Sequence, residues 1–284
     1  MNRLSTGPRS LTSSTTGSDR VVKRIYNHLV AREHFRGPVL DHYLAHGWFR
    51  AGRLMHTTSH IEYGALLRVL ELRYRIADIG LPASQARIRR RASRFKVVIR
   101  PFMGISAEHE DFFQRYLQVV DFGKELTLQD MLFGHFEVDT LAFETVVIKV
   151  LDGTQQVALG FFDIGVESAA AIVHCYDPAY KWYSPGKMLF HLTLDWLRDH
   201  GYRYYYPGYI AAGNSRFDYK RCLGEAALEY YNPDSEDWQP FSPDILRPEQ
   251  LSPEQQLEVY LKLMMNEVQV IGANDDSLPS TYTD

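Results

Sequence analysis

The chain has 284 residues, of which 45% are hydrophobic and 23% charged, so it can fold around a sizeable core and is not disordered over most of its length. Its 31 basic and 35 acidic side chains give a net charge of −4, so a nucleic-acid partner would need a local basic surface. No run of about 18 apolar residues is present, which excludes a membrane-spanning helix. The first residues lack an apolar signal core, and the two cysteines form no disulfide framework, so we expect a cytoplasmic protein.

The first part of the chain predicts a tail followed by short helices and strands. Residues 1–20 are rich in Ser, Thr and Gly and predict a disordered tail. Alternation of apolar and charged residues predicts a strand from Leu70 to Ile76. The other expected elements are helices over Val21–Arg32, Pro38–His46 and Ser84–Arg94 (capped by Ser84), and strands over Phe49–Thr57 and Phe95–Ile99.

The second part has a clear order of elements. Apolar spacing predicts a helix over Ser106–Val119 with Ser106 as its N-cap. The turn Asp152-Gly153 is a strong hairpin signal between two apolar runs. In chain order we expect strands Ala142–Leu151, Gln155–Gly165 and Ala169–Tyr176, a helix Lys187–His200, strands Tyr202–Tyr209 and Ala226–Tyr231, and a last helix Pro253–Val268.

This order predicts the fold class. Three antiparallel strands, a helix and a further strand are the core order of a GNAT-like N-acyltransferase. We therefore expect an α+β protein whose mixed sheet is flanked by helices, with a smaller α+β domain before it. The expected division is a tail over 1–20, an N-terminal domain over 21–104, the acyltransferase domain over 105–250, and a C-terminal helix and tail over 251–284.

The turn before the predicted helix argues against coenzyme A as the acyl carrier. Coenzyme A enzymes of this fold show a Gln/Arg-x-x-Gly-x-Gly/Ala motif there, where backbone amides and the helix dipole hold phosphate. Here the turn runs Asp177-Pro178-Ala179-Tyr180-Lys181-Trp182-Tyr183-Ser184-Pro185-Gly186. The alternative is a plain strand-to-helix loop without a ligand.

An ordered set of motifs resembles one family. Tyr176-Asp177-Pro178, Ser184-Pro185-Gly186, Tyr206-Pro207-Gly208-Tyr209 and Phe217-Asp218-Tyr219-Lys220 resemble the C-terminal domain of arginyl-tRNA–protein transferases and their bacterial leucyl-transferring relatives. Gly47-Trp48-Phe49-Arg50-Ala51-Gly52, the stretch Ser84–Arg91 and the Phe112–Leu117 segment resemble motifs of the same family in the same order. The resemblance covers about residues 40–235.

The sequence also departs from that family. Relatives carry a run of cysteines after the Gly-Trp motif, whereas this chain reads Leu54-Met55-His56-Thr57-Thr58-Ser59-His60. We therefore expect no iron–sulfur cluster, no zinc and no other cofactor. Pro207 replaces the usual Leu, and Arg216 and Phe217 stand where Lys and Met are common.

The resemblance implies aminoacyl transfer from a charged tRNA to the free N-terminal amine of an acceptor protein, with no membrane and no DNA involved. It implies a catalytic pair, Tyr176 and Asp177, with the carboxylate as base or ammonium anchor. The donor and acceptor would be held by Ser184, Gly186, Lys187, Gly208, Tyr209, Arg216, Tyr219 and Lys220. An Asp-Pro turn initiator is the alternative for Asp177.

The segment Ser84–Arg100 holds seven basic and no acidic residues. Several arginines on one element suit phosphate oxygens, so we expect tRNA binding by Arg87, Arg89, Arg90, Arg91 and Arg94. The alternative is a solvated helix face whose arginines pair with carboxylates elsewhere.

Other side chains have simpler interpretations. Tyr202, Tyr204, Tyr205, Tyr206 and Tyr209 predict a central strand whose rings fill the core, with Tyr209 the expected exception. The pairs His42/His46 and His56/His60 have the spacing of helical metal ligands, although the second pair fits a strand or loop better than a helix. Cys175 and Cys222 are interpreted as small buried residues.

Two other functions compete with transfer. One is a catalytically silent relative that binds tRNA or protein, and the other is an N-acetyltransferase that uses acetyl-CoA. Coenzyme A binding distinguishes the second of these, and tRNA binding without transfer distinguishes the first.

Overall fold

The structure is a computed structural model that describes residues 23–80, 83–120, 126–134, 136–248 and 251–264. The tails expected over residues 1–20 and 273–284 lie outside the described residues.

The strands are β1 (Lys23–Val30), β2 (Phe49–Ala51), β3 (Leu54–Glu62), β4 (Leu66–Arg75), β5 (Lys96–Pro101), β6 (Thr145–Asp152), β7 (Gln155–Ile164), β8 (Ser168–Tyr176), β9 (Tyr204–Ala211), β10 (Leu228–Asn232) and β11 (Asp237–Pro240). The α-helices are α1 (Pro38–Ala45), α2 (Ala83–Ala92), α3 (Ala107–Leu117), α4 (Leu128–Phe133), α5 (Pro185–Asp199) and α6 (Pro253–Met264). The 3₁₀ turns are η1 (Ile76–Asp78), η2 (Pro178–Tyr183), η3 (Ser215–Arg221), η4 (Glu225–Ala227) and η5 (Pro243–Leu246).

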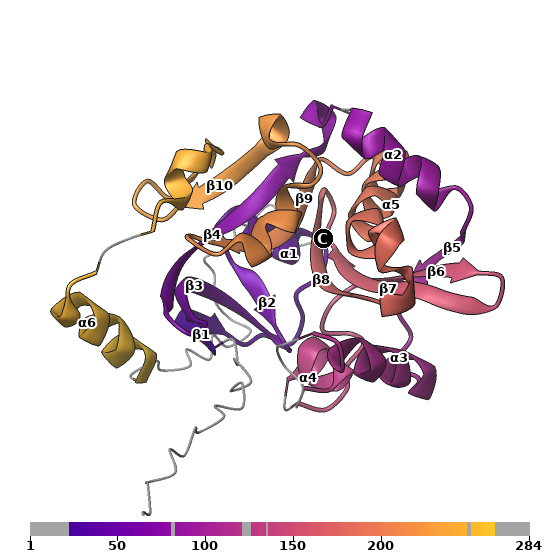
Figure 1. The fold of residues 1–284 in the computed structure, drawn as a ribbon. Helices are drawn as coiled ribbons and strands as arrows, with labels where there is room; N and C mark the ends of the chain where they lie inside the picture. The colour runs from indigo at the N-terminus through magenta and orange to yellow at the C-terminus, as the bar shows by residue number, and fades with distance from the viewer. Residues whose placement is uncertain (1–22, 81–82, 121–125, 135, 249–250, 265–284) are drawn as a thin grey trace, which may run out of the picture.

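One mixed sheet joins the two parts of the chain. Within the described residues its main path runs β1-β3-β4-β9-β8-β7-β6-β5, with β2 beside β3 and the β10–β11 pair beside β4 (Figure 1). The strands β6, β7 and β8 are antiparallel, and β9 joins β8 in parallel after the crossover helix α5. Strands from both sides of residue 104 therefore belong to the same sheet.

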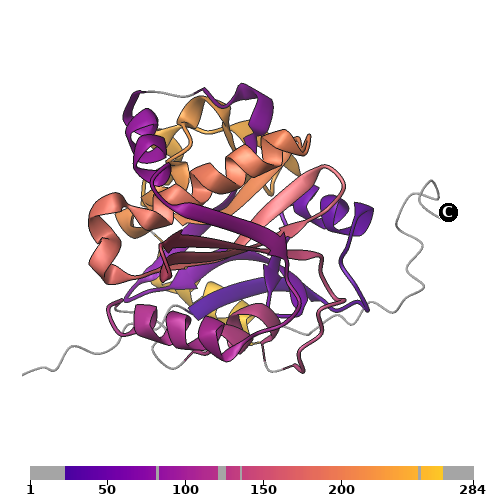
Figure 2. The same cartoon turned by 90° about the vertical axis from the view of Figure 1, so that its right-hand side faces the viewer.

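Helices cover both faces of this sheet. Figure 2 shows α2 and α5 on one face and α3 on the other. The core under α5 contains Leu189, Leu194 and Tyr205, and the core under α3 and α4 contains Phe112, Leu132 and Phe161. Burial of these side chains is the main favourable term in folding. In the part of the chain that is described, no helix has the length and apolarity needed to cross a bilayer.

The predicted GNAT-like order is confirmed, and several local signals are confirmed with it. Asp152 and Gly153 lie in the turn of the β6–β7 hairpin. Ser106 caps α3, because its hydroxyl accepts a hydrogen bond from the His109 backbone N–H. The mixed sheet flanked by helices is the α+β class expected from the sequence.

Some element predictions are wrong. The described part of Val21–Arg32 is the strand β1, because it pairs with β3 along its length. The strand expected over Phe49–Thr57 divides into β2 and β3 at Gly52. This glycine has a φ of 59°, and a Cβ there would lie 2.6 Å from the Gly134 nitrogen. The basic helix α2 begins at Ala83, so Ser84 lies inside it rather than at its cap.

Arg50, which belongs to the Gly-Trp motif, has a structural role. Its buried guanidinium donates to both carboxylate oxygens of Asp163 on β7, at 2.8 and 3.0 Å. It also donates to the Leu132 carbonyl oxygen and lies 4.0 Å from the centre of the Phe143 ring. One side chain therefore joins β2 to β7 and to the end of α4.

Candidate active site

The parallel pair β8–β9 opens after three residue pairs. Ser168, Ala169 and Ala170 pair with Tyr204, Tyr205 and Tyr206. Beyond them β8 continues beside β7 as far as Tyr176, and β9 continues beside β4 as far as Ala211. We call the gap between these diverging ends the splay. In open sheets, ligands bind outside the carboxyl ends of the strands at the point where neighbouring strands diverge.

A bulge in β9 shapes one side of the splay. Gly208 pairs with Leu72 and Tyr205 pairs with Tyr74, so the register against β4 shifts at Tyr206 and Pro207, and the proline interrupts no regular ladder bond. Gly208 has a φ of 90°, and a Cβ there would lie 3.0 Å from the Lys220 Nζ. Any larger residue at position 208 would therefore be strained and would press on Lys220.

The turn η3 brings three predicted residues to the same place. The Lys220 ammonium donates to the Tyr209 carbonyl oxygen at 2.7 Å and lies 4.4 Å from the centre of the Tyr209 ring. The Tyr219 ring lies 5.9 Å from Phe190 of α5. Arg216 donates to the Tyr63 hydroxyl oxygen. The charge of Lys220 also contributes to lowering the pKa of His174 on β8.

The other side of the splay is formed by Tyr176 and the start of α5. The Tyr176 ring lies 5.2 Å from Tyr116 of α3, and it would be 3.9 Å from a Cβ on Gly186. Burial raises the pKa of Tyr116 well above its ordinary value. Among the smaller contributions from η3, Tyr219 raises this pKa and the charge of Arg216 lowers it. The sequence pattern placed Tyr116 only on the apolar face of a helix.

The start of α5 presents backbone donors to this region. Ser184 is in the left-handed conformation (φ 57°, ψ 55°) and Pro185 is the first helical residue. The N–H groups of Gly186 and Lys187 follow in the first turn, where a helix offers no acceptor of its own. Burial raises the pKa of the Cys222 thiol, just beyond η3, and the positive charge of the exposed Lys187 side chain partly offsets this rise. The first turn therefore suits an anion or a developing oxyanion.

Asp177 has contacts that fit the turn-initiator alternative. Its carboxylate accepts the backbone N–H of Ala179 at 2.9 Å and the side-chain amide of Gln155 at 3.2 Å, so it caps η2. Beside it lies a pocket of about 220 Å³, lined by Phe112, Arg115, Tyr116, Gln118, Tyr176, Asp177 and Pro178. Asp177 therefore lies at the rim of the splay, and its role as a base stays a prediction.

Two histidines, His191 on α5 and His174 on β8, are held neutral by burial. Burial lowers the pKa of His191 to about 4, with the charges of Arg89 and Lys187 adding to the shift. Burial also lowers the pKa of His174 to about 3, with Lys220 contributing. Both values lie below the value of about 6.5 that histidine has in an unfolded chain.

The buried histidines predict that the protein loses stability in acid. Between about pH 6.5 and pH 4 the unfolded chain binds a proton at position 191 that the folded protein does not. The free energy of unfolding should therefore fall as the pH falls through this window, by up to about 1.4 kcal/mol per pH unit for His191. Urea unfolding at pH 7.5, 6 and 5 measures this slope. His191→Met should make the slope shallower, and an unchanged slope would contradict the assignment.

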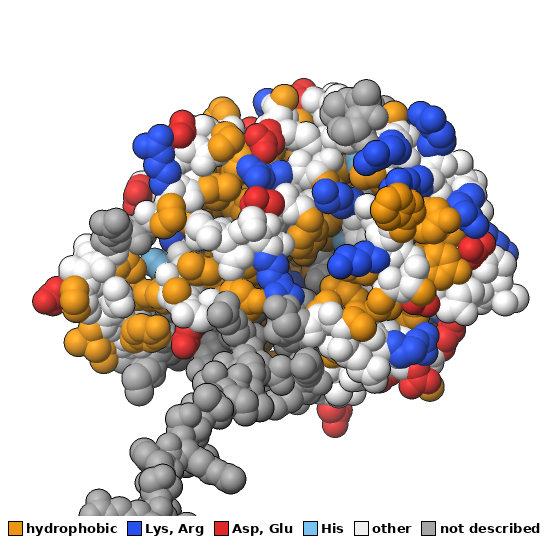
Figure 3. Space-filling view, viewed as in Figure 1, with side chains coloured by type: hydrophobic (Ala, Val, Ile, Leu, Met, Phe, Trp, Pro, Cys, Tyr) orange, Lys and Arg blue, Asp and Glu red, His pale blue; other side chains and the backbone are white. Residues whose placement is uncertain are grey.

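The predicted tRNA-binding arginines, on α2 and just after it, fall into two groups. Arg89 forms an ion pair with Asp195 of α5, and Arg94 donates to the Tyr183 hydroxyl at 2.6 Å and to Asp152 at 3.4 Å. Arg91 donates to the Trp182 carbonyl oxygen at 2.8 Å. Arg87 and Arg90 are exposed, and no ion pair joins them to an acidic side chain of the described residues. Figure 3 shows basic side chains gathered over the region of α2 and α5.

The tyrosine strand fills the core, as expected for most of its rings. Tyr205 and Tyr206 are buried, but the expected exception is wrong: Tyr209 is only 7% exposed, because it packs against Phe217 at 5.5 Å.

Among the described residues, no group of three or more His, Cys, Asp or Glu side chains is close enough to hold a metal. His56 and His60 lie on the strand β3, where four positions span about 13 Å. The rings of His42 on α1 and of its C-cap residue His46 lie 4.4 Å apart and are tilted by 44°. Cys175 is buried, whereas Cys222 is only partly buried.

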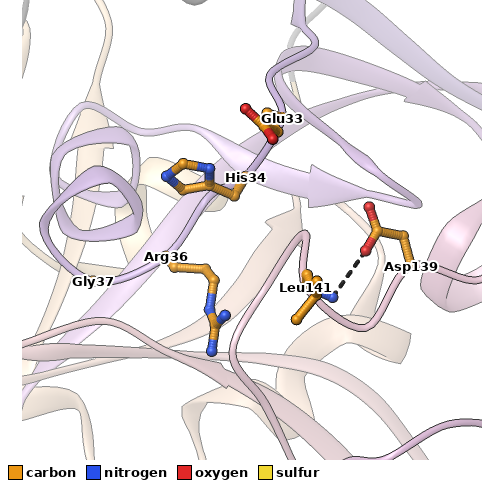
Figure 4. Close-up of a pocket in the computed structure, with 6 residues that line it drawn as sticks. All are labelled: Glu33, His34, Arg36, Gly37, Asp139 and Leu141. Atoms are coloured by element: carbon orange, nitrogen blue, oxygen red, sulfur yellow. Dashed lines mark hydrogen bonds between the residues drawn. The ribbon is translucent and has the colours of Figure 1, made fainter.

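A second pocket lies away from the predicted site residues. Its volume is about 500 Å³, and it is lined by Glu33, His34, Arg36, Gly37, Asp139 and Leu141 (Figure 4). Asp139 accepts the Leu141 N–H at 2.9 Å and pairs with Arg53 at 2.9 Å. None of the residues predicted to bind donor or acceptor lines this pocket.

One protein family matches the part of the chain that contains the splay. The family described as "Arginine-tRNA-protein transferase, C terminus" matches residues 108–229, which include β8, α5, β9 and η3 but not α2. No curated protein matches the sequence. Similar solved structures include the C-terminal domain (DUF2156) of a putative lysylphosphatidylglycerol synthetase from Agrobacterium fabrum, at 16% identity and a TM-score of 0.33, covering 50% of this chain and 48% of that one.

The structure titled L-PGS from Bacillus licheniformis is also similar, at 12% identity and a TM-score of 0.35, covering 50% of this chain and 46% of that one. The chain thus spans about half the length of these solved structures. The family match alone bears on function: the region that forms the splay is similar to the C terminus of arginine-tRNA-protein transferases.

Proposed function

We propose that the protein transfers an amino acid, arginine or leucine, from a charged tRNA to the N-terminal amine of an acceptor protein in the cytoplasm. The observation that carries this proposal is the coincidence of two findings. The family match to arginine-tRNA-protein transferases covers residues 108–229, and within that range lie the two strand ends, the helix start and the cationic turn η3 that meet at the splay.

The reaction needs no cofactor, because an aminoacyl ester is already activated. The acceptor amine loses a proton and its nitrogen forms a bond to the ester carbonyl carbon. The bond from that carbon to the tRNA 3′ oxygen then breaks, and the tRNA leaves with a hydroxyl group. The protein's part is to orient the two reactants, to accept the proton and to stabilise the oxyanion of the tetrahedral intermediate.

The residues of the splay can be given roles in this reaction. The N–H groups of Gly186 and Lys187 and the ammonium of Lys220 supply positive charge where the oxyanion develops. Arg216 and Lys220 suit an acidic side chain on the acceptor's first residue. Gly208 lets the donor's amino acid approach the β9 backbone, with Tyr176, Tyr209 and Tyr219 as its aromatic surroundings.

A panel assay tests the proposal. The protein is incubated with radiolabelled leucyl-, arginyl- and phenylalanyl-tRNA and peptides that differ in their first residue, and with labelled acetyl-CoA in parallel. We expect label to move to peptides from arginyl- or leucyl-tRNA and not from acetyl-CoA. Binding of tRNA without transfer would support the silent relative, and acetylation would support the N-acetyltransferase.

Asp177→Asn separates the carboxylate's two possible roles. The amide oxygen can still accept the Ala179 N–H, so the cap of η2 and the thermal midpoint should change little. If the carboxylate is the base, the transfer rate should fall by about 10²-fold or more while tRNA affinity stays nearly the same. Transfer at the wild-type rate would leave Asp177 as a turn residue only.

Replacing Arg87 and Arg90 together with Ala tests the basic helix. Each phosphate that is no longer neutralised by an arginine should reduce the slope of log affinity against log salt by about 0.9, so we expect the slope for tRNA to fall by nearly 2. Arg89→Ala serves as the comparison, because its partner Asp195 is within the protein and its removal should affect stability more than binding. Unchanged affinity and slope in the double variant would exclude α2 from the RNA surface.

A further inference from the structure

The most exposed aromatic ring of the described residues lies beside the basic helix. Trp182 of η2 is 79% exposed. The other two rings of this turn point inward: Tyr180 and Tyr183 pack against Phe95 with ring centres 6.1 and 5.4 Å away. A single exposed apolar side chain is common on protein surfaces, so the case for binding depends on the rigid backbone and the charges beside this indole.

The turn that carries Trp182 is held in place on both sides. Asp177 caps its first residues, and the Ser184 N–H donates to the Lys181 carbonyl oxygen at 3.0 Å at its end. The Trp182 carbonyl oxygen itself accepts a hydrogen bond from Arg91 at 2.8 Å. The backbone under the indole is therefore fixed, which lowers the entropic cost of binding a ligand on the ring.

Positive charge surrounds the indole. The Arg91 guanidinium lies 5.7 Å from the centre of the Trp182 ring, and the exposed Lys181 is its neighbour in sequence. Arg87 and Arg90 lie on α2, and Arg94 follows two residues after its end and pairs with the Asp152 carboxylate. We call this surface the α2–η2 ridge; it lies in the region where Figure 3 shows basic side chains around an apolar patch.

The ridge leads into the splay. The turn η2 begins directly after Tyr176 and Asp177, and only three residues separate Trp182 from Gly186 at the start of α5. A ligand lying across Trp182 would therefore have its end close to the residues assigned to the reaction.

We propose that Trp182 stacks on an unpaired base near the 3′ end of an RNA, while the arginines of α2 neutralise the adjoining phosphates. The inference rests on the proposed function for its RNA and goes beyond it by assigning the single-stranded end to the ridge. Aromatic stacking beside a basic groove is how proteins hold single-stranded nucleic acid. A membrane surface fits less well, because interfacial binding buries several apolar side chains and η2 exposes one ring.

Binding of two RNA hairpins tests this inference. One hairpin carries a single-stranded 3′ overhang and the other has the same stem with a blunt end, and both are uncharged with amino acid. Trp182→Ala should weaken binding of the overhang hairpin by about 5- to 100-fold, leave the blunt hairpin nearly unaffected, and leave the salt slope unchanged. Trp182→Phe should restore most of the affinity. Leu141→Ala, at a residue 68% exposed and outside the ridge, is the control and should change neither affinity.

Three results would overturn the inference. They are equal affinity of Trp182→Ala and wild type for the overhang, an equal weakening for overhang and blunt hairpins, and Trp182-dependent binding to vesicles of phosphatidylglycerol and phosphatidylcholine without preference for the overhang. A parallel transfer assay separates this inference from the proposed function. Trp182-dependent binding of the overhang without transfer would contradict only the proposed function, and transfer without such binding would contradict only this inference.

Discussion

Lys220→Met is expected to lower the rate of aminoacyl transfer by about 10²-fold or more. Lys220 donates a 2.7 Å hydrogen bond to the Tyr209 carbonyl oxygen on β9, and its charge contributes to lowering the pKa of His174 on β8. A positive group placed where an oxyanion develops contributes this much in acyl transfer. Methionine keeps the length and the packing of the side chain but removes the charge.

Two further variants make the result specific. Lys220→Arg keeps the charge and should retain more activity than Lys220→Met. Lys262→Met removes an exposed lysine from α6, which pairs with Glu258 in its own helix, and should leave the rate unchanged. The rates are measured at saturating tRNA, with tRNA affinity determined separately. If Lys220→Met transferred as fast as the wild type, the splay would lose its assigned electrostatic role.

The second large effect concerns stability and the buried pair of Arg50 and Asp163. Arg50→Met leaves the carboxylate of Asp163 buried without its cation, and this should lower the free energy of unfolding by about 3–5 kcal/mol. Both side chains are almost fully buried, at 3% and 0% exposure, so solvent cannot screen the unpaired charge. Chemical denaturation at pH 7.5 measures the effect.

A double variant and an exposed pair provide the controls. Arg50→Met combined with Asp163→Leu removes both charges and should be more stable than Arg50→Met alone. Removing the exposed pair of Arg203 and Glu167 through Arg203→Met should leave the unfolding midpoint nearly unchanged. If the double variant were less stable than either single variant, the pair would not act as a coupled unit.

The sequence predicted the elements whose signals are local. The Asp152-Gly153 turn and the Ser106 cap depend on a few neighbouring residues, and both were identified correctly. The strand β1 was mistaken for a helix because its conformation is imposed by pairing with β3, which follows much later in the chain (Val30 pairs with Met55, and Lys23 with Glu62). Distant pairing of this kind leaves only a weak pattern in the strand itself.

The site residues named from the sequence stay a prediction. The structure places Lys220 beside Gly208 and Tyr209, and Tyr176 beside Tyr116 and the start of α5. Tyr116 and His174 were missed, since one lay within an apolar helical pattern and the other within a strand. The alternation of β8 offered a signal for His174, because it lies two positions before Tyr176 and therefore on the same face of the sheet. The partners of Arg50 and Arg89 are more than 100 positions away and left no signal in the sequence.

Single-turnover transfer tests the central claim most directly. A tRNA charged with labelled arginine or leucine is mixed with excess protein and a peptide that has a free N-terminus, and both the ester on the tRNA and the amide on the peptide are followed in the same sample. We predict that the ester disappears and the amide forms at the same rate, that the label is found on the peptide's α-amine, and that an N-terminally acetylated peptide receives none. Persistence of the ester on bound tRNA, or its hydrolysis to free amino acid without amide formation, would contradict aminoacyl transfer by this protein.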